Sequence, residues 1–298
     1  MNPNSGHIRL PAGKWIDHIL RREVLGRARK GFVLLALLGF GVSLVLAFLS
    51  RMGTLPDAYV PPLFRNYFFA FYVAFSVVLV WEVMAMIYTI PYSLADSVGK
   101  QFEIMSLIII RYLFEHIDNY LHIADFQSNW KEIAQVFGIT ASTLVLYYLI
   151  KIFYDIQPHK SITEDPTNRH NFVRIKKGFA FILLITLLTY AGFEMSQSVF
   201  HLLEGTFNDT HLGHVFFKNM FSIMIFFDIL MILLTMWYGA RYSVVFRTSA
   251  LTVSTILLRI AFSEDLFVMI GLTILSILFA IGVSWVYMRF DKEPVYKR

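Results

Sequence analysis

Eight apolar segments recur along the chain, and most of them are about as long as a helix that crosses a membrane. They cover residues near 31–50, 67–93, 102–118, 133–154, 177–198, 218–240, 248–262 and 266–289. An α-helix rises about 1.5 Å per residue, so about twenty residues span the roughly 30 Å of hydrocarbon in a bilayer. The alternating pattern of an outer-membrane barrel is absent. The sequence therefore predicts an all-α integral membrane protein with eight transmembrane helices.

The composition agrees with a chain whose main partner is the lipid bilayer. Of the 298 residues, 57% are hydrophobic and only 16% are charged, and the mean hydropathy is +0.59. These values lie outside the range of ordinary soluble domains. The chain has no cysteine, which excludes disulfides and thiol catalysis. The first apolar segment starts at Gly31 with no small-residue cleavage site after it, so we expect no cleaved signal peptide.

The basic residues predict the orientation of the chain. With eight crossings both termini lie on one side, and that side receives nineteen Lys and Arg residues. The other side receives only four, Arg51, Arg65, Lys131 and Lys218. Cytoplasmic loops carry the excess of Lys and Arg in membrane proteins. We therefore expect a protein of the inner or plasma membrane with cytoplasmic N- and C-termini. The formal charge of +5 follows from this bias, and we expect no nucleic-acid partner.

Similar short segments recur in the same order in the two halves of the chain. The matched pairs are Arg29–Phe32 with Lys176–Phe179, Phe64–Asn66 with Phe217–Asn219, Tyr88/Tyr92/Ser93 with Tyr238/Tyr242/Ser243, Ser106–Phe114 with Ser254–Phe262, and Phe137–Thr140 with Ile270–Thr273. Together they predict a tandem duplication of a four-helix unit in parallel repeats. The predicted parts are an amphipathic inner-leaflet segment (1–28), the first repeat (29–154), a cytoplasmic linker (155–175), the second repeat (176–290) and a cytoplasmic tail (291–298).

Each repeat carries one arginine and one acid deep in an apolar segment. A charge at this depth costs several kcal/mol unless it faces the bundle and has a partner. Counting residues from the inner turns gives matching depths for Glu82 with Arg111 and for Asp228 with Arg259. We predict one interhelical ion pair per repeat. Ser106 and Ser254 are expected to support the pairs by accepting a spare guanidinium N–H. The pairs either fix helix register, or belong to an ion path or gate, or face a cavity holding lipid or water.

Residues 13–28 have an apolar flank surrounded by arginines. Trp15 lies on the apolar flank, and Arg21, Arg22 and Arg27 lie around it. This pattern is typical of an amphipathic helix on the inner leaflet. These four residues are therefore candidates for contact with lipid headgroups or with a partner protein.

Signatures of metals, cofactors and catalysis are weak. Acids and histidines gather near the predicted outer ends, but Glu115 and His116 are adjacent, and His211 and His214 lie in a glycine-containing segment. We expect no metal and no haem, since haem needs histidine pairs well inside the membrane. The chain has no H-E-x-x-H, G-x-S-x-G or P-loop motif, so we expect no enzyme.

Three functions from different classes stay open at this point. The first is an oligomeric ion channel, in which helices bearing the countercharges line a path, and a homo-oligomer is expected. The second is a non-catalytic anchor or scaffold subunit of a larger membrane complex. The third is a small-solute transporter, although no helix has the interrupted centre from which midplane sites are built. Small residues at Gly39, Gly138 and Gly271 further predict close contacts between repeats or between chains.

Overall fold

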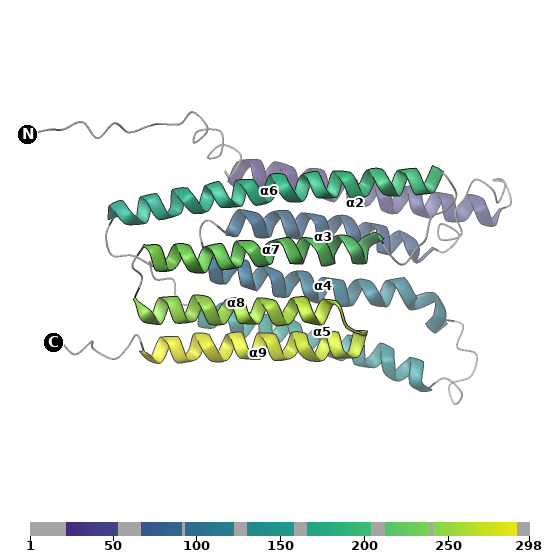
Figure 1. Cartoon of the computed structure of the whole chain (residues 1–298). Coiled ribbons are helices and arrows are strands. Elements are labelled where there is room, and N and C mark those ends of the chain that lie inside the picture. The colour runs from purple at the N-terminus through teal and green to yellow at the C-terminus, as the bar shows by residue number, and fades with distance from the viewer. Residues whose placement is uncertain are drawn as a thin grey trace, which may run out of the picture.

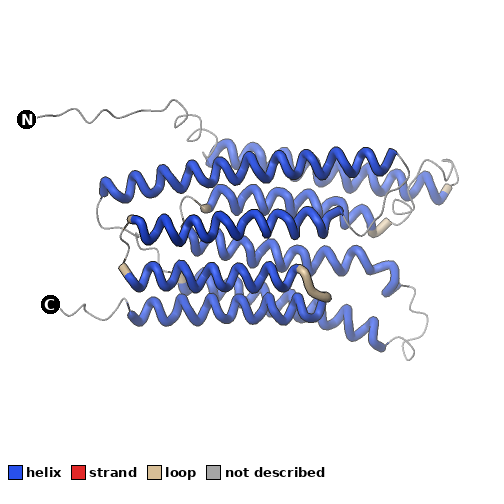
Figure 2. The backbone as a smooth tube through the Cα atoms, in the orientation of Figure 1, coloured by secondary structure: helices blue, strands red, loops and turns tan. Residues whose placement is uncertain are grey.

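The computed structural model describes residues 22–52, 67–90, 93–121, 130–157, 166–203, 212–238 and 241–290, and every regular element in these ranges is an α-helix (Figures 1 and 2). The helices are α2 (Arg22–Arg51), α3 (Phe69–Thr89), α4 (Leu94–Leu121), α5 (Trp130–Ile156), α6 (Pro166–Leu203), α7 (Leu212–Trp237), α8 (Tyr242–Phe262) and α9 (Leu266–Phe290). Each predicted segment overlaps one of these eight helices, so the prediction of an all-α fold is confirmed for the described residues.

Six of the described helices are long and apolar enough to cross a membrane, namely α2, α3, α5, α7, α8 and α9. Helix α4 carries Asp96, Lys100, Glu103 and Arg111, which lower its apolar character. Helix α6 has 38 residues, and its sequence contains no charged residue from 178 to 193. A multi-pass membrane protein follows from the six spans, and the crossing by α4 and α6 stays a prediction.

Local chemistry moves several helix ends away from their predicted positions. Helix α4 begins eight residues earlier than predicted, because the Ser93 side chain caps it: the Asp96 backbone N–H donates to Ser93 Oγ at 3.1 Å. Helix α6 begins at Pro166, where the fixed φ of proline suits the first helical turn. Helix α2 begins at Arg22 and runs without a break through residues 28 and 29, where the sequence predicted a boundary between an interfacial segment and the first repeat.

Successive helices alternate in direction across one elongated bundle (Figure 1). We call the two ends of the bundle the Tyr242 end, where α8 begins, and the Phe262 end, where α8 ends. Within each half, every helix packs on the next along the chain, from α2 to α5 and from α6 to α9. The halves meet mainly through α5 with α9 and α4 with α8, helices that the repeat prediction treats as equivalent. The duplication and its boundaries stay a prediction.

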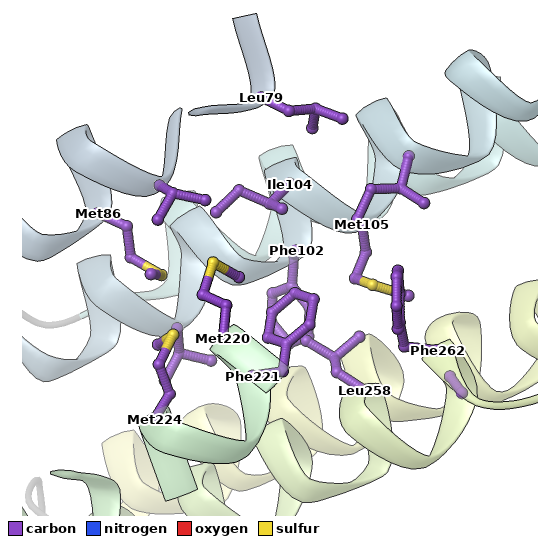
Figure 3. Close-up of a cluster of buried hydrophobic side chains, with 14 of the residues drawn as sticks. Leu79, Met86, Phe102, Ile104, Met105, Met220, Phe221, Met224, Leu258 and Phe262 are labelled. Carbon is purple, nitrogen blue, oxygen red and sulfur yellow. The ribbon is translucent and has the colours of Figure 1, made fainter. Parts of the chain in front are cut away.

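A single apolar core joins the two halves. Figure 3 shows side chains of α3 and α4, including Phe102 and Met105, directed at side chains of α7 and α8. Phe221 of α7 packs on Phe262 of α8 with ring centroids 5.6 Å apart. Gly138 of α5 lies beside Phe267 of α9, whose Cε1 atom is 3.7 Å from the position of an added Cβ. The halves therefore share one core.

Large apolar side chains also cover much of the exterior. Helix α2 exposes Val33, Leu34, Leu37 and Leu38, and it packs mainly on α3. The predicted close approach at Gly39 is made to Val73 of α3 within the same half, at 3.1 Å from an added Cβ. A surface of this kind is stable when it faces lipid tails.

Candidate functional site

Among the ion pairs between described residues, the most deeply buried one joins α7 to α8. Arg259 Nη2 donates to Asp228 Oδ2 at 2.5 Å, and Thr255 Oγ1 lies 3.0 Å from the same oxygen. The side chains of Arg259 and Asp228 are only 6% and 10% exposed. The pair predicted between these two residues is therefore present. A desolvated pair of this kind costs little only when its remaining polar atoms are also satisfied.

Two donors of Arg259 remain open. Its Nε and Nη1 atoms are buried and have no hydrogen-bond partner among the described residues. A buried donor without an acceptor costs about 1–3 kcal/mol. This edge of the guanidinium can therefore hold an acceptor such as a water molecule.

Buried polar side chains extend from this pair along both helices. We define the polar seam as Asp228 and Thr235 of α7 with Thr248, Thr252, Thr255 and Arg259 of α8. All six are buried. The spacing of four, three and four residues along α8 places its members on one face, which the contacts of Thr255 and Arg259 direct at α7. Thr235 follows Asp228 by seven residues and lies on the same face of α7.

The buried part of the seam is shorter than a membrane is thick. From Thr248 to Arg259 the α8 axis rises about 16 Å, roughly half of the hydrocarbon thickness. Beyond Arg259 the turn at Ser263, Glu264 and Asp265 is exposed. At the other end Tyr242 is exposed as well. The seam thus lies buried between the two exposed ends of α8.

In the first half the predicted pairing of Glu82 with Arg111 is wrong. Glu82 Oε2 accepts a hydrogen bond from Lys100 Nζ at 3.2 Å. Arg111 donates from Nη1 to Ser76 Oγ at 3.5 Å, and its Cζ lies 4.7 Å from the ring centroid of Tyr72. The α3 residues that Arg111 contacts are six and ten residues before Glu82. They therefore lie about 9 Å or more from Glu82 along the helix axis.

Helix register explains this correction. When Tyr88 is aligned with Tyr238, an offset of 150 residues, Asp228 falls on Val78. Glu82 lies four residues beyond that position, about 6 Å nearer the Tyr242 end, where Lys100 is within reach. The depth count for Arg111 also started at Lys100, whereas α4 begins at Leu94. The two acids do not occupy equivalent places.

The predicted support by Ser106 and Ser254 is also wrong. Ser106 Oγ donates to the Glu103 carbonyl oxygen at 2.8 Å within α4. Ser254 Oγ donates to the carbonyl oxygen of Ser276 on α9 at 2.9 Å. Each serine precedes its arginine by five residues, which turns it about 140° around the helix axis. A residue four positions before the arginine faces the same side, as Thr255 does.

A second polar cluster links α3, α4 and α5 near the Tyr242 end. Lys100 Nζ lies 3.2 Å from Glu82 Oε2 and 2.5 Å from Glu103 Oε2. Tyr154 of α5 donates its hydroxyl to Glu103 Oε1 at 2.7 Å. Gly99 makes this possible, because a Cβ there would lie 2.6 Å from the Tyr154 ring and hydroxyl. The Lys100 and Glu82 side chains are 26% and 20% exposed, so this cluster is less desolvated than the polar seam.

Polar contacts also join the two halves near the Tyr242 end. Arg247 of α8 donates from Nη2 to Gln157 Oε1, at the end of α5. Gln157 Nε2 donates to Ser284 Oγ of α9 at 3.1 Å. Arg247 Cζ also lies 4.8 Å from the ring centroid of Tyr287. This junction ties the second half to the end of the first.

Aligned positions behave alike in the two halves. The offset of 133 residues between Phe137 and Ile270 aligns Tyr154 with Tyr287, and the offset of 148 between Ser106 and Ser254 aligns Gly99 with Arg247. In each half the aligned tyrosine lies against the aligned position of α4 or α8. This is the arrangement that a duplication predicts.

The remaining predicted residues lie at or beyond the edge of the described chain. Trp15 and Arg21 fall outside the described residues, and Arg22 starts α2 without a described side chain. Arg27 is exposed on α2. The described part of the chain contains no group of three His, Asp or Glu that could hold a metal ion. Of the outer acids and histidines named above, His211 lies outside the described residues, and Glu115, His116 and His214 lie in helices without described side chains.

Sequence reasoning missed the threonines of the polar seam and the cluster of Lys100, Glu103 and Tyr154. The threonines have a readable signal, since they precede Arg259 at helical spacing on a single face. The cluster has only a weak sequence signal, the adjacent residues Gly99 and Lys100. No family model, curated protein or solved structure matched this chain in comparisons of its sequence and fold.

Proposed function

We propose that this chain conducts ions across a membrane along the polar seam. The observation that carries the proposal is the seam itself, six buried polar side chains on the facing sides of α7 and α8 that end on an ion pair. Ionisable groups inside membrane bundles commonly mark ion pathways. In this proposal the Tyr242 end faces the cytoplasm, in accord with the excess of basic residues on that side.

The ion pair acts as the barrier of the proposed path. When Arg259 holds Asp228, both charges are neutralised and the route between the helices is closed. Movement of α7 against α8 by a fraction of a turn separates the two groups and exposes the carboxylate to an ion. The alternative role, in which the pair only fixes the register of α7 and α8, predicts no effect on transport.

Flux through reconstituted liposomes tests the proposal. Thr252→Val and Thr255→Val remove hydroxyl groups from the path while keeping side-chain volume. Loss of one polar group on the path raises the barrier by about 1–3 kcal/mol, which lowers flux by about five- to 150-fold. Thr140→Val and Thr186→Val are matched controls, because these threonines are exposed and also bond their own helix backbone. Equal flux in all four variants would contradict the proposal.

A membrane anchor or scaffold subunit is the second candidate. Helix α2 supports it, because α2 packs mainly on α3 and leaves a broad apolar face, and basic residues precede it in the sequence. Native mass spectrometry of gently extracted protein separates the two functions. A homo-oligomer free of other subunits favours conduction, whereas stoichiometric foreign subunits that are lost when residues 1–21 are removed favour the scaffold.

A further inference from the structure

The chemistry of the polar seam limits which ion can use it. Each threonine hydroxyl of the seam has a carbonyl oxygen three or four residues earlier in its own helix at 2.7 to 3.1 Å. A hydroxyl has one proton and two lone pairs. At Thr235, Thr248 and Thr252 the proton is used on the backbone, so the hydroxyl oxygen offers lone pairs to the seam. Thr255 instead donates to Asp228 Oδ2, and the Asp228 carboxylate adds two acceptor atoms. Acceptor oxygens favour a cationic carrier over an anion.

Close packing favours the smallest carrier. The seam residues are all buried, and Thr255 has no exposed surface. A hydrated metal cation needs several water molecules or a ring of ligands around it. Successive side chains on one helix face are about 5–6 Å apart, which is the span of one water molecule hydrogen-bonded to both. A proton can move along such a file without opening a wide pore.

The ion pair supplies a group that can take up a proton and release it. Among the described residues, the charged group that faces Asp228 is Arg259 of α8, and Thr255 is the neutral one. Both bond to Oδ2, which leaves Oδ1 for an incoming proton. The Nε and Nη1 donors of Arg259 are buried without an acceptor among the described residues and can hold a water molecule close to that carboxylate.

We propose that the ion carried along the polar seam is a proton, relayed through the Asp228 carboxyl group; this inference rests on the proposed function. A water molecule held by Arg259 takes up a proton from the Phe262 end and then passes one on. One of its O–H bonds breaks, an O–H bond forms on Asp228 Oδ1, and the water molecule and the carboxyl group are both left neutral. The loss of charge weakens the contact with Arg259, whose own charge does not change. The carboxyl group then gives the proton to a water molecule on the Thr255 side. One proton has entered, one has left, and the ion pair forms again.

The test measures which ion sets the zero-current potential of the reconstituted full chain. In planar bilayers we expect this potential to follow a pH difference and to stay unchanged when K⁺, Na⁺ or Cl⁻ is exchanged. Asp228→Asn should lower proton flux about tenfold or more, because an amide cannot take up and release the proton. Glu82→Gln is the matched control, since it makes the same change in the partly exposed cluster of the first half, and it should leave the flux unchanged.

Folding of the variants is checked separately. If Asp228→Asn leaves Arg259 unpaired and the protein does not fold, the double variant Asp228→Asn with Arg259→Gln removes both charges and serves in its place. A current carried by K⁺, Na⁺ or Cl⁻ and indifferent to pH would overturn the proton assignment and leave the proposed conduction intact. Absence of any ion flux from folded wild-type protein would overturn both.

Discussion

The helical hairpins α3–α4 and α7–α8 contain matched sequence segments but arrange their polar groups differently. Lys100, Ile104 and Leu107 of α4 align with Thr248, Thr252 and Thr255 of α8 at the offset of 148 residues. In α4 the polar contacts therefore fall in two places, Lys100 with Glu82 and Arg111 with Ser76, with apolar side chains between them. In α8 they form one buried file that ends on Asp228.

The position of the acid on the neighbouring helix therefore decides which contacts the two matched arginines, Arg111 and Arg259, make. Asp228 lies level with Arg259, whereas Glu82 lies one turn too near Lys100. Arg111, whose α3 contacts lie away from Glu82, meets the Ser76 hydroxyl and the Tyr72 ring on that helix. Among the described contacts, the α7–α8 hairpin is the one that combines a deeply buried ion pair with a row of buried threonines next to it.

The largest expected effect is on stability when Arg259 is removed. Arg259→Leu leaves the Asp228 carboxylate buried without its countercharge, and loss of one partner from a buried pair costs about 3–5 kcal/mol. The free energy of unfolding, measured by denaturant titration in micelles, should fall by this amount. Arg111→Leu is the comparison in the other hairpin, and the loss of its cation–π contact with Tyr72 and its hydrogen bond to Ser76 should contribute about 1–2 kcal/mol. Equal losses would show that the two arginines do not differ.

The register explanation can be tested by moving an acid into the first hairpin. Ser76→Asp places a carboxylate at the α3 residue whose Oγ accepts from Arg111 Nη1 at 3.5 Å. We expect this variant and Arg111→Leu to show a coupling energy of about 2 kcal/mol in a double-mutant cycle. The same cycle with Glu82→Gln in place of Ser76→Asp should give a coupling near zero. A large coupling between Glu82 and Arg111 would contradict the register argument.

The cluster at the Tyr242 end of α4 depends on the absence of a side chain at position 99. Gly99→Ala places a Cβ within 2.6 Å of the Tyr154 ring and hydroxyl, so the ring must move away from Glu103. Overpacking of this kind should cost about 1 kcal/mol or more, seen as a lower unfolding temperature. Gly178→Ala has open space around it and should be neutral or slightly stabilising. A neutral Gly99→Ala would mean that Tyr154 moves freely.

The smallest effect is expected for the Glu82 carboxylate. Glu82→Gln leaves Lys100 with Glu103 at 2.5 Å, and partly exposed pairs contribute about 0–1 kcal/mol. The free energy of unfolding should therefore change by less than about 1 kcal/mol. A loss as large as that of Arg259→Leu would remove the distinction between the two hairpins.

The sequence by itself predicted the eight helices of the described chain. Its apolar segments are mostly long enough to cross a membrane, and in lipid such segments are satisfied as helices. The sequence also predicted the ion pair of Asp228 with Arg259, whose two residues lie at the same depth in the bundle. Only the tertiary structure decided that Arg111 contacts Ser76 and that Tyr154 passes over Gly99 to reach Glu103. It also decided that both halves share one core.

The physical reason is that side-chain pairing depends on the register of neighbouring helices to within one turn, about 5.4 Å. That register is set by where each helix begins, as at the Ser93 cap of α4, and by packing with residues that are distant in the sequence. Composition and periodicity reveal which side chains must find a partner inside the bundle. The level at which each one lies, and therefore the partner it finds, is decided by the folded bundle.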